Sequence, residues 1–198
     1  SLGEKVGDNY PVYWNEGDCI AINGQASDEI LIDESNRSTA TFKASSELKR
    51  PYRITYPHSE GVSPNVIFPA EQNYTEGTFA QGYAPMCGYA ENNGDNVVLK
   101  HLVGVIRLPI KASQEGITLA KVVITSLNGT KISGEFAVDC ISGALVAASN
   151  TSNKITYTLP DNFTLSTNKE SIFHITIPAV EVGDCTLELI ESSGKKMT

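Results

Sequence analysis

Apolar residues alternate with polar ones in many short runs along this chain. Because successive side chains of a strand point to opposite faces, each run predicts a strand with one buried face and one solvated face. Turn-rich gaps of Asn, Ser, Thr and Gly separate the runs. The clearest runs place apolar side chains at Ile155, Tyr157 and Leu159, at Phe173, Ile175 and Ile177, and at Cys185, Leu187 and Leu189.

Shorter strands are predicted upstream, at residues 19–22, 29–32, 39–42, 53–56, 66–68 and 85–89. Pro57, Pro64 and Pro69 bracket the middle ones and confine them to edges or strand ends, because proline cannot donate to a ladder. Nothing sustains the i, i+3, i+4, i+7 spacing of an amphipathic helix, and no repeat of fixed period is visible. The pattern therefore predicts an all-β fold, a sandwich or barrel of antiparallel strands with long loops and little or no helix.

The strongest local signal is a turn at Asn128-Gly129, which lies between the β-branched runs at residues 122–127 and 132–138. Asn-Gly tolerates the positive φ of a tight hairpin turn. The sequence thus predicts a hairpin that joins these two runs. In its second strand, Phe136 and Val138 are predicted to be buried and Glu135 to be solvated.

Residues 97–111 change phase internally. Val103 and Val105 continue one apolar face, whereas Ile106 and the apolar positions after it lie on the other. A change of phase inside a strand predicts a bulge or bend, which we assign to Gly104, so that one long strand serves two packing surfaces. Pro109 predicts that the far end of this strand is an edge.

The 198 residues are enough for one domain, or two small ones at most, and we expect a single all-β domain over residues 1–198. A net charge of −8 and a pI near 4.9 argue against nucleic acid as a partner, because a polyanion requires a dense Lys/Arg patch. No apolar run approaches the ~20 residues of a membrane-spanning helix.

The four cysteines, Cys19, Cys87, Cys140 and Cys185, lie far apart and form no Cys-x-x-Cys pair for zinc or redox chemistry. Their even number leaves a disulfide framework open. In a domain of this size, free and mostly buried thiols are favoured, because cysteine packs well as a small apolar residue.

Candidate catalytic groups are scattered. His58 follows Tyr56-Pro57 in a predicted loop, His101 lies within the segment 97–111, and His174 occupies the polar phase of an alternating strand. Each is therefore interpreted as a structural or a surface residue. The acidic pairs at residues 28–29 and 33–34 are interpreted as solvated strand ends, with an acid/base pair as the alternative.

Residues 91–96 are rich in oxygen ligands, but they lack the bidentate Glu of a calcium loop and are interpreted as a turn. Trp14 and the tyrosines could line a sugar-stacking platform, although packing is favoured for each. No phosphate-binding or nucleophile motif is present. We therefore expect no catalytic, cofactor-binding or metal-binding residues and no enzymatic activity.

Three segments carry an ordered set of motifs. Residues 12–24 contain Trp-x-x-Gly-Asp, starting at Trp14. Residues 56–86 run from Tyr-Pro through Phe-Pro-Ala-Glu-Gln-Asn-Tyr to Ala-Pro-Met, and residues 99–110 contain Lys-His-x-x-Gly. Together they resemble the fimbrillin family, the subunits of surface fimbriae in anaerobic gut and oral bacteria, and residues 132–136 and 173–178 are similar to late strands of its amino-terminal domain.

This resemblance implies a transthyretin-like or immunoglobulin-like sandwich, with the family's carboxy-terminal domain absent. It also implies export as a lipoprotein precursor, a place on the fimbria or outer membrane, and assembly with other fimbrial subunits by β-strand exchange. Trp14 and Gly17 would set the first turn, and no site residues carry over. The chain is thus expected to be a structural or adhesive subunit that contacts host or bacterial surface proteins or glycans.

Two other classes of function remain open from the sequence. The same sandwich could be a surface carbohydrate-binding module or glycan-binding lipoprotein, or an accessory domain of a larger enzyme.

Overall fold

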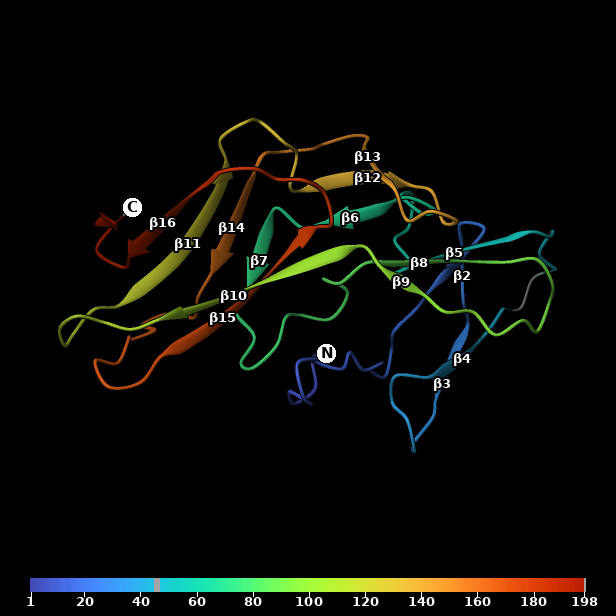
Figure 1. The fold of residues 1–198 in the computed structure, drawn as a ribbon, viewed down its shortest axis with the longest axis horizontal. Helices are drawn as coiled ribbons and strands as arrows, with labels where there is room; N and C mark the ends of the chain where they lie inside the picture. The colour runs from blue at the N-terminus through green and yellow to red at the C-terminus, as the bar shows by residue number, and fades with distance from the viewer. Residues whose placement is uncertain (45–46, 198) are drawn as a thin grey trace.

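The computed structural model describes residues 1–44 and 47–197, which form strands, turns and loops without a helix (Figure 1). The all-β prediction is confirmed, and β3 and β6 match their predicted ranges. The strands are β1 (Ala21–Ile22), β2 (Gln25–Ala26), β3 (Glu29–Ile32), β4 (Ala40–Lys43), β5 (Tyr52–Tyr56), β6 (Val66–Phe68), β7 (Glu71–Asn73), β8 (Met86–Ala90), β9 (Lys100–His101), β10 (Val103–Ile110), β11 (Leu119–Ser126), β12 (Gly134–Val138), β13 (Leu145–Ala147), β14 (Lys154–Thr158), β15 (Ser171–Pro178), β16 (Cys185–Glu191) and β17 (Lys196–Met197).

The strands pair into five sheets, with orders β2-β1-β5-β8-β9, β17-β16-β11-β14-β7, β13-β12-β6, β10-β15 and β3-β4. All named pairs are antiparallel except β7 with β14, which is parallel. Figure 1 places β10 and β15 across from β11, β14 and β16 in one half of the molecule, with β5, β8 and the β3–β4 hairpin in the other half. The arrangement is a β-sandwich extended at one end by the hairpin.

Three apolar clusters fill the spaces between these sheets. The first lies between β10-β15 and the sheet of β11, β14 and β16, and it includes Phe173 and Tyr157. The second lies between β8 and the β13-β12-β6 sheet, around Phe68 and Phe136, whose rings meet edge to face at 5.2 Å. The third lies between the β3–β4 hairpin and the other face of β5 and β8, around Trp14.

Residues 97–111 contact all three clusters in turn. Leu99 packs on the third, Leu102 lies in the second, and Ile106 packs on the first. The segment divides into β9, which pairs with β8, and β10, which pairs with β15. The prediction that this segment serves more than one packing surface is confirmed, whereas the prediction of one long strand is wrong, because Leu102 divides the segment into two strands.

The change of partner occurs at Leu102, so the assignment of the bend to Gly104 is wrong. Leu102 donates its N–H to the carbonyl of Pro85 at 2.9 Å, before β8, and its own carbonyl accepts from Ala179 at 2.8 Å, after β15. Gly104 has no left-handed φ and lies in register opposite Ile177. The Leu102 side chain is 1% exposed, and the alternation of buried and exposed residues changes phase at this position. Burial of Leu102 therefore explains why the strand partner changes there.

Pro109 lies at an edge, as predicted. Among the described residues β10 pairs with β15 alone. The bonded pair of Leu102 with Ala179 sets the alternation along this ladder, and it leaves Pro109 in a non-bonded pair with Ile172. The missing N–H of the proline therefore faces away from β15.

The predicted hairpin across Asn128-Gly129 is wrong. The turn itself is present, with Gly129 at φ +81° and the Asn128 side chain accepting from the N–H of Thr130 at 3.0 Å. However, β11 pairs with β14 and β16, whereas β12 pairs with β6 and β13. The Asn-Gly turn sets the local backbone conformation and does not choose the strand partners. Because β14 and β16 already occupy both edges of β11, the chain crosses after the turn to the sheet of β6, β12 and β13.

Gln72 of β7 joins two sheets through a fully buried side chain. Its Nε2 donates to the carbonyl of Thr176 on β15 at 2.7 Å, and its Oε1 accepts from the backbone N–H of Thr176 at 3.0 Å. The Thr176 hydroxyl donates to the same oxygen at 3.2 Å. Thr176 forms a non-bonded pair with Val105 in the β10–β15 ladder, so its backbone N–H and C=O point away from β10. The Gln72 amide bonds to these two groups as the backbone of a neighbouring strand would.

Candidate functional site

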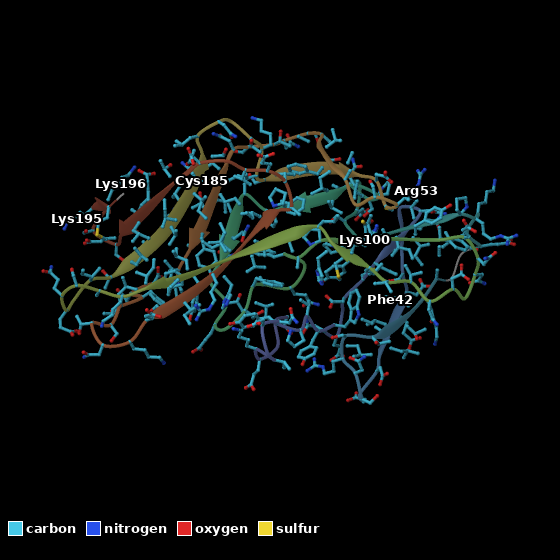
Figure 2. The ribbon with its side chains drawn as sticks, viewed as in Figure 1. Phe42, Arg53, Lys100, Cys185, Lys195 and Lys196 are labelled. Carbon is cyan, nitrogen blue, oxygen red and sulfur yellow. The ribbon has the colours of Figure 1, made fainter. Side chains whose placement is uncertain are left out.

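A large groove lies between the β3–β4 hairpin and the sheet of β1, β5, β8 and β9. Its volume is about 1780 Å³. Phe42, Ile54 and Leu99 contribute apolar lining from three strands or loops that are distant in the sequence. Figure 2 shows Phe42 on the hairpin below the level of Lys100 and Arg53, which lie on the sheet side.

The inner end of the groove is built on aromatic rings. Trp14 meets Phe42 at 4.9 Å and Tyr56 at 5.2 Å between ring centroids, both edge to face. The indole is 9% exposed, so its faces are occupied by protein. Trp14 therefore anchors the hairpin to the sheet, as the packing interpretation of the sequence predicted, and does not offer a stacking platform.

A buried carboxylate holds this end together. Asp18 accepts hydrogen bonds from the Tyr56 hydroxyl at 2.6 Å, from Gln81 Nε2 at 2.8 Å and from the backbone N–H of Asn15 at 2.7 Å. Burial and the adjacent Asp18 carboxylate raise the pKa of Tyr56 far above its ordinary value. The network fixes residues 14–18 to β5. Gln81 was not identified from the sequence, because it lies in a turn without periodicity.

The outer end of the groove is polar. Residues 92–95 form the predicted turn, in which Asn92 donates its N–H to Asp95 at 2.8 Å and Gly94 has φ +81°. Arg50 donates to the Asn92 side chain at 3.3 Å. The acidic pairs at residues 28–29 and 33–34 are exposed, as predicted, and Glu29 forms an ion pair with Lys43 at 2.7 Å.

One wall of the groove is the free edge of β4. The backbone N–H of Asp33 donates to the carbonyl of Thr39, and bonded pairs alternate along an antiparallel ladder, so Thr41 and Leu31 form the next bonded pair. Ala40 and Phe42 therefore direct their backbone N–H and C=O groups away from β3. Among the described residues β4 has β3 as its single strand partner, and residues 38–44 line the groove continuously.

The three histidines lie in three separate places. His58 is in the loop after β5, His101 is on β9 at the groove, and His174 is on β15. No group of three or more His, Cys, Asp or Glu side chains within residues 1–44 and 47–197 is placed to hold a metal ion. His174 is 7% exposed, so the prediction of a solvated face at this position is wrong, because both faces of β15 are covered.

Acidification is expected to destabilise the fold through His174. Burial, and next the neighbouring Arg107 guanidinium, hold the pKa of His174 below its ordinary value of 6.5. A lowered folded-state pKa contributes stability that is present above the unfolded pKa and is lost as pH falls through 6.5 toward the folded value. The urea midpoint should therefore fall between about pH 7 and pH 5.

The matched variant for this effect is His174→Asn, measured beside the parent protein at both pH values. Its midpoint should change less on acidification. We assign the remaining fall in its urea midpoint to His101, because partial desolvation at the groove wall also lowers the pKa of this histidine. If the urea midpoint of His174→Asn fell between pH 7 and pH 5 by as much as that of the parent protein, His174 would not titrate in this range.

All four cysteines are free thiols, as the sequence predicted. Cys87 and Cys140 are buried, Cys19 is half-buried, and Cys185 is exposed. The prediction that most are buried therefore holds for the interior pair and not for the thiol on β16.

No protein-family model matches this sequence, and no curated protein matches it. The fold is similar to the crystal structure of a candidate cell adhesion protein from Bacteroides uniformis, with a TM-score of 0.53 and 14% identity over 93% of this chain and 78% of that chain. This likeness supports the β-sandwich architecture. In the part of the chain that the structure describes, no helix has the length and apolar character needed to span a membrane.

Proposed function

We propose that this protein is a non-enzymatic cell-surface subunit that acts in adhesion, and that its groove receives a β-strand from a neighbouring subunit. The free edge of β4 along an apolar groove is the observation that carries this proposal. The likeness in fold to a candidate cell adhesion protein from Bacteroides uniformis supports the adhesive role. The order of fimbrillin-like motifs favours a fimbria as the assembly.

The geometry suits strand addition. An incoming strand could bond to the N–H and C=O groups of Ala40 and Phe42, while alternate side chains entered the apolar lining near Ile54 and Leu99. Backbone bonds would supply affinity and the side chains would supply specificity. A contact between different surfaces of successive subunits does not close, so it would extend into a fibre.

The export, location and partners that we propose follow from the resemblance to the fimbrillin family. The chain would act as one sandwich domain of a subunit exported as a lipoprotein precursor and displayed on the fimbria or outer membrane. Its partners would be other subunits of the same fibre and a protein or glycan on a host or bacterial surface. Neither nucleic acid nor a catalytic reaction has a part in it.

Ala40→Pro tests the strand-addition step. The substitution removes the backbone N–H that faces the groove, and proline is tolerated on an edge where its missing N–H faces outward. Loss of one buried hydrogen bond costs about 1–3 kcal/mol, so assembly should weaken on the order of tenfold or more. Filament length and number on cells that express the full-length protein would be measured by electron microscopy.

Ala147→Pro is the matched control. Ala147 also lies on an edge strand, and the bond from the N–H of Ala148 to the carbonyl of Glu135 shows that Ala147 directs its own N–H away from β12. This variant should assemble normally. Normal filaments from Ala40→Pro, with the circular dichroism spectrum of both variants unchanged, would contradict strand addition at β4.

A further inference from the structure

Cys87 and Cys140 lie together in the second apolar cluster, although they come from opposite sheets. Cys87 is on β8 and is fully buried, and Cys140 follows β12 and is 5% exposed. Cys140 Sγ also approaches the backbone carbonyl of Ile54 on β5 at 3.7 Å. The loop that carries Cys140 therefore rests directly on the β5–β8 pair, where Thr55, the residue after Ile54, is in register with Cys87.

The two thiols have different acidities. The neighbouring Cys140 side chain is the main cause that lowers the pKa of Cys87, and the nearby Lys100 ammonium also lowers it. The Cys87 side chain, together with burial, raises the pKa of Cys140. Lys100 in turn donates to the carbonyl of Ile141 at 2.6 Å, which holds the loop after Cys140 against β9.

We propose that Cys87 and Cys140 are a covalent modification site, at which the two thiols are oxidised to a disulfide that joins the two facing sheets. The pair is set apart from the other cysteines by position. Cys19 hydrogen-bonds to the carbonyl of Ser27 at 3.3 Å, and Cys185 lies in the half of the molecule away from Lys100 and Arg53 (Figure 2). Neither of them shares a cluster with a second thiol.

The oxidant would be a protein disulfide, the class of oxidant present in compartments that receive exported proteins. Cys87 loses its proton, and its thiolate attacks one sulfur of the oxidant, which releases a thiolate and forms a mixed disulfide. Cys140 then loses its proton and attacks the Cys87 sulfur, which expels the second thiolate. The pair gives up two protons and two electrons, and the oxidant becomes a dithiol. Because both thiols are buried in the folded protein, the oxidation takes place while the chain is folding.

The cross-link would close a loop of about 50 residues between positions 87 and 140. Such a loop restricts the unfolded chain, so the oxidised protein should unfold at a temperature higher by roughly 5–15 °C than the reduced protein. The floor of the groove, on β5 and β8, would be tied to the opposite sheet.

The test refolds the full chain with an excess of oxidised glutathione as the probe oxidant. Intact mass under alkylation, peptide mapping without reduction, and the thermal midpoint with and without dithiothreitol are then measured. The proposal predicts a mass lower by two hydrogen atoms, a peptide that links positions 87 and 140, and a midpoint that falls on reduction.

Two double variants complete the design. Cys19→Ser/Cys185→Ser keeps only the interior pair and should oxidise fully with the same rise in midpoint, whereas Cys87→Ser/Cys140→Ser should show neither. The proposal is overturned if the refolded protein keeps both interior thiols reduced, or if the map links any other pair. It is also overturned if the disulfide forms and the thermal midpoint does not rise, because the linked geometry would then be foreign to the fold.

Discussion

Replacing Gln72 with leucine should lower the free energy of unfolding by about 2–6 kcal/mol, because two buried backbone groups lose their partner and each costs about 1–3 kcal/mol when unpaired. Those groups are the N–H and the carbonyl of Thr176, which bond to the Gln72 amide at 3.0 Å and 2.7 Å. Leucine has a similar size, so loss of packing contributes little. Urea denaturation at constant m-value would measure the change.

Thr176→Val is the control for this site. It removes the hydroxyl that donates to Gln72 at 3.2 Å and leaves both backbone bonds in place. Loss of one ordinary hydrogen bond costs about 0.5–1.5 kcal/mol, so the variant should be much more stable than Gln72→Leu. Equal losses in the two variants would show that the hydroxyl, and not the backbone pairing, gives Gln72 its importance.

Gly134→Ala should destabilise the protein by about 3 kcal/mol or more, from backbone strain together with a clash. Gly134 begins β12 at φ +104°, a conformation that residues with a Cβ rarely adopt. A Cβ at this position would overlap the carbonyl oxygen of Asn150 and lie 2.6 Å from Thr151 Cα. Both obstacles are backbone atoms, which cannot rotate away as a side chain could. Thermal or urea unfolding would measure the loss.

Gly104→Ala is the contrasting substitution. An added Cβ would meet Ile177 at an ordinary contact distance of 3.5 Å, and no positive φ is required there. The variant should remain within about 1 kcal/mol of the parent, and replacing a strand glycine can even stabilise. If Gly104→Ala lost more stability than Gly134→Ala, the bend in residues 97–111 would have to be assigned to Gly104 and not to Leu102.

The positions of most strands were predictable, because the alternation of apolar and polar residues is a local property of each strand. Residues 29–32 and 66–68 match β3 and β6 without a shift. Pairing was less predictable. The Asn128-Gly129 turn is correct in conformation, yet the strands on its two sides join different sheets, because burial of β11 between β14 and β16 decides its partners.

The groove could not be foreseen from the chain, because its lining comes from segments that are brought together only by folding. Trp14 was marked by its motif, whereas Phe42 and Leu99 resembled any other strand residue. Gln72 gave no signal either, since a glutamine beside Asn73 in a polar stretch indicates a solvated turn. Its role depends on β15, whose second edge became visible only in the folded chain.

The segment at residues 97–111 has a mechanical consequence. Its β10 portion makes eight register pairs with β15, and the hydrogen bonds of an antiparallel ladder lie perpendicular to the strands. A pull along this segment would load those bonds together in shear, whereas a pull across it would open them one after another. In the fibre that we propose, the resistance of each subunit to tension would therefore depend on the direction in which β10 lies relative to the fibre axis.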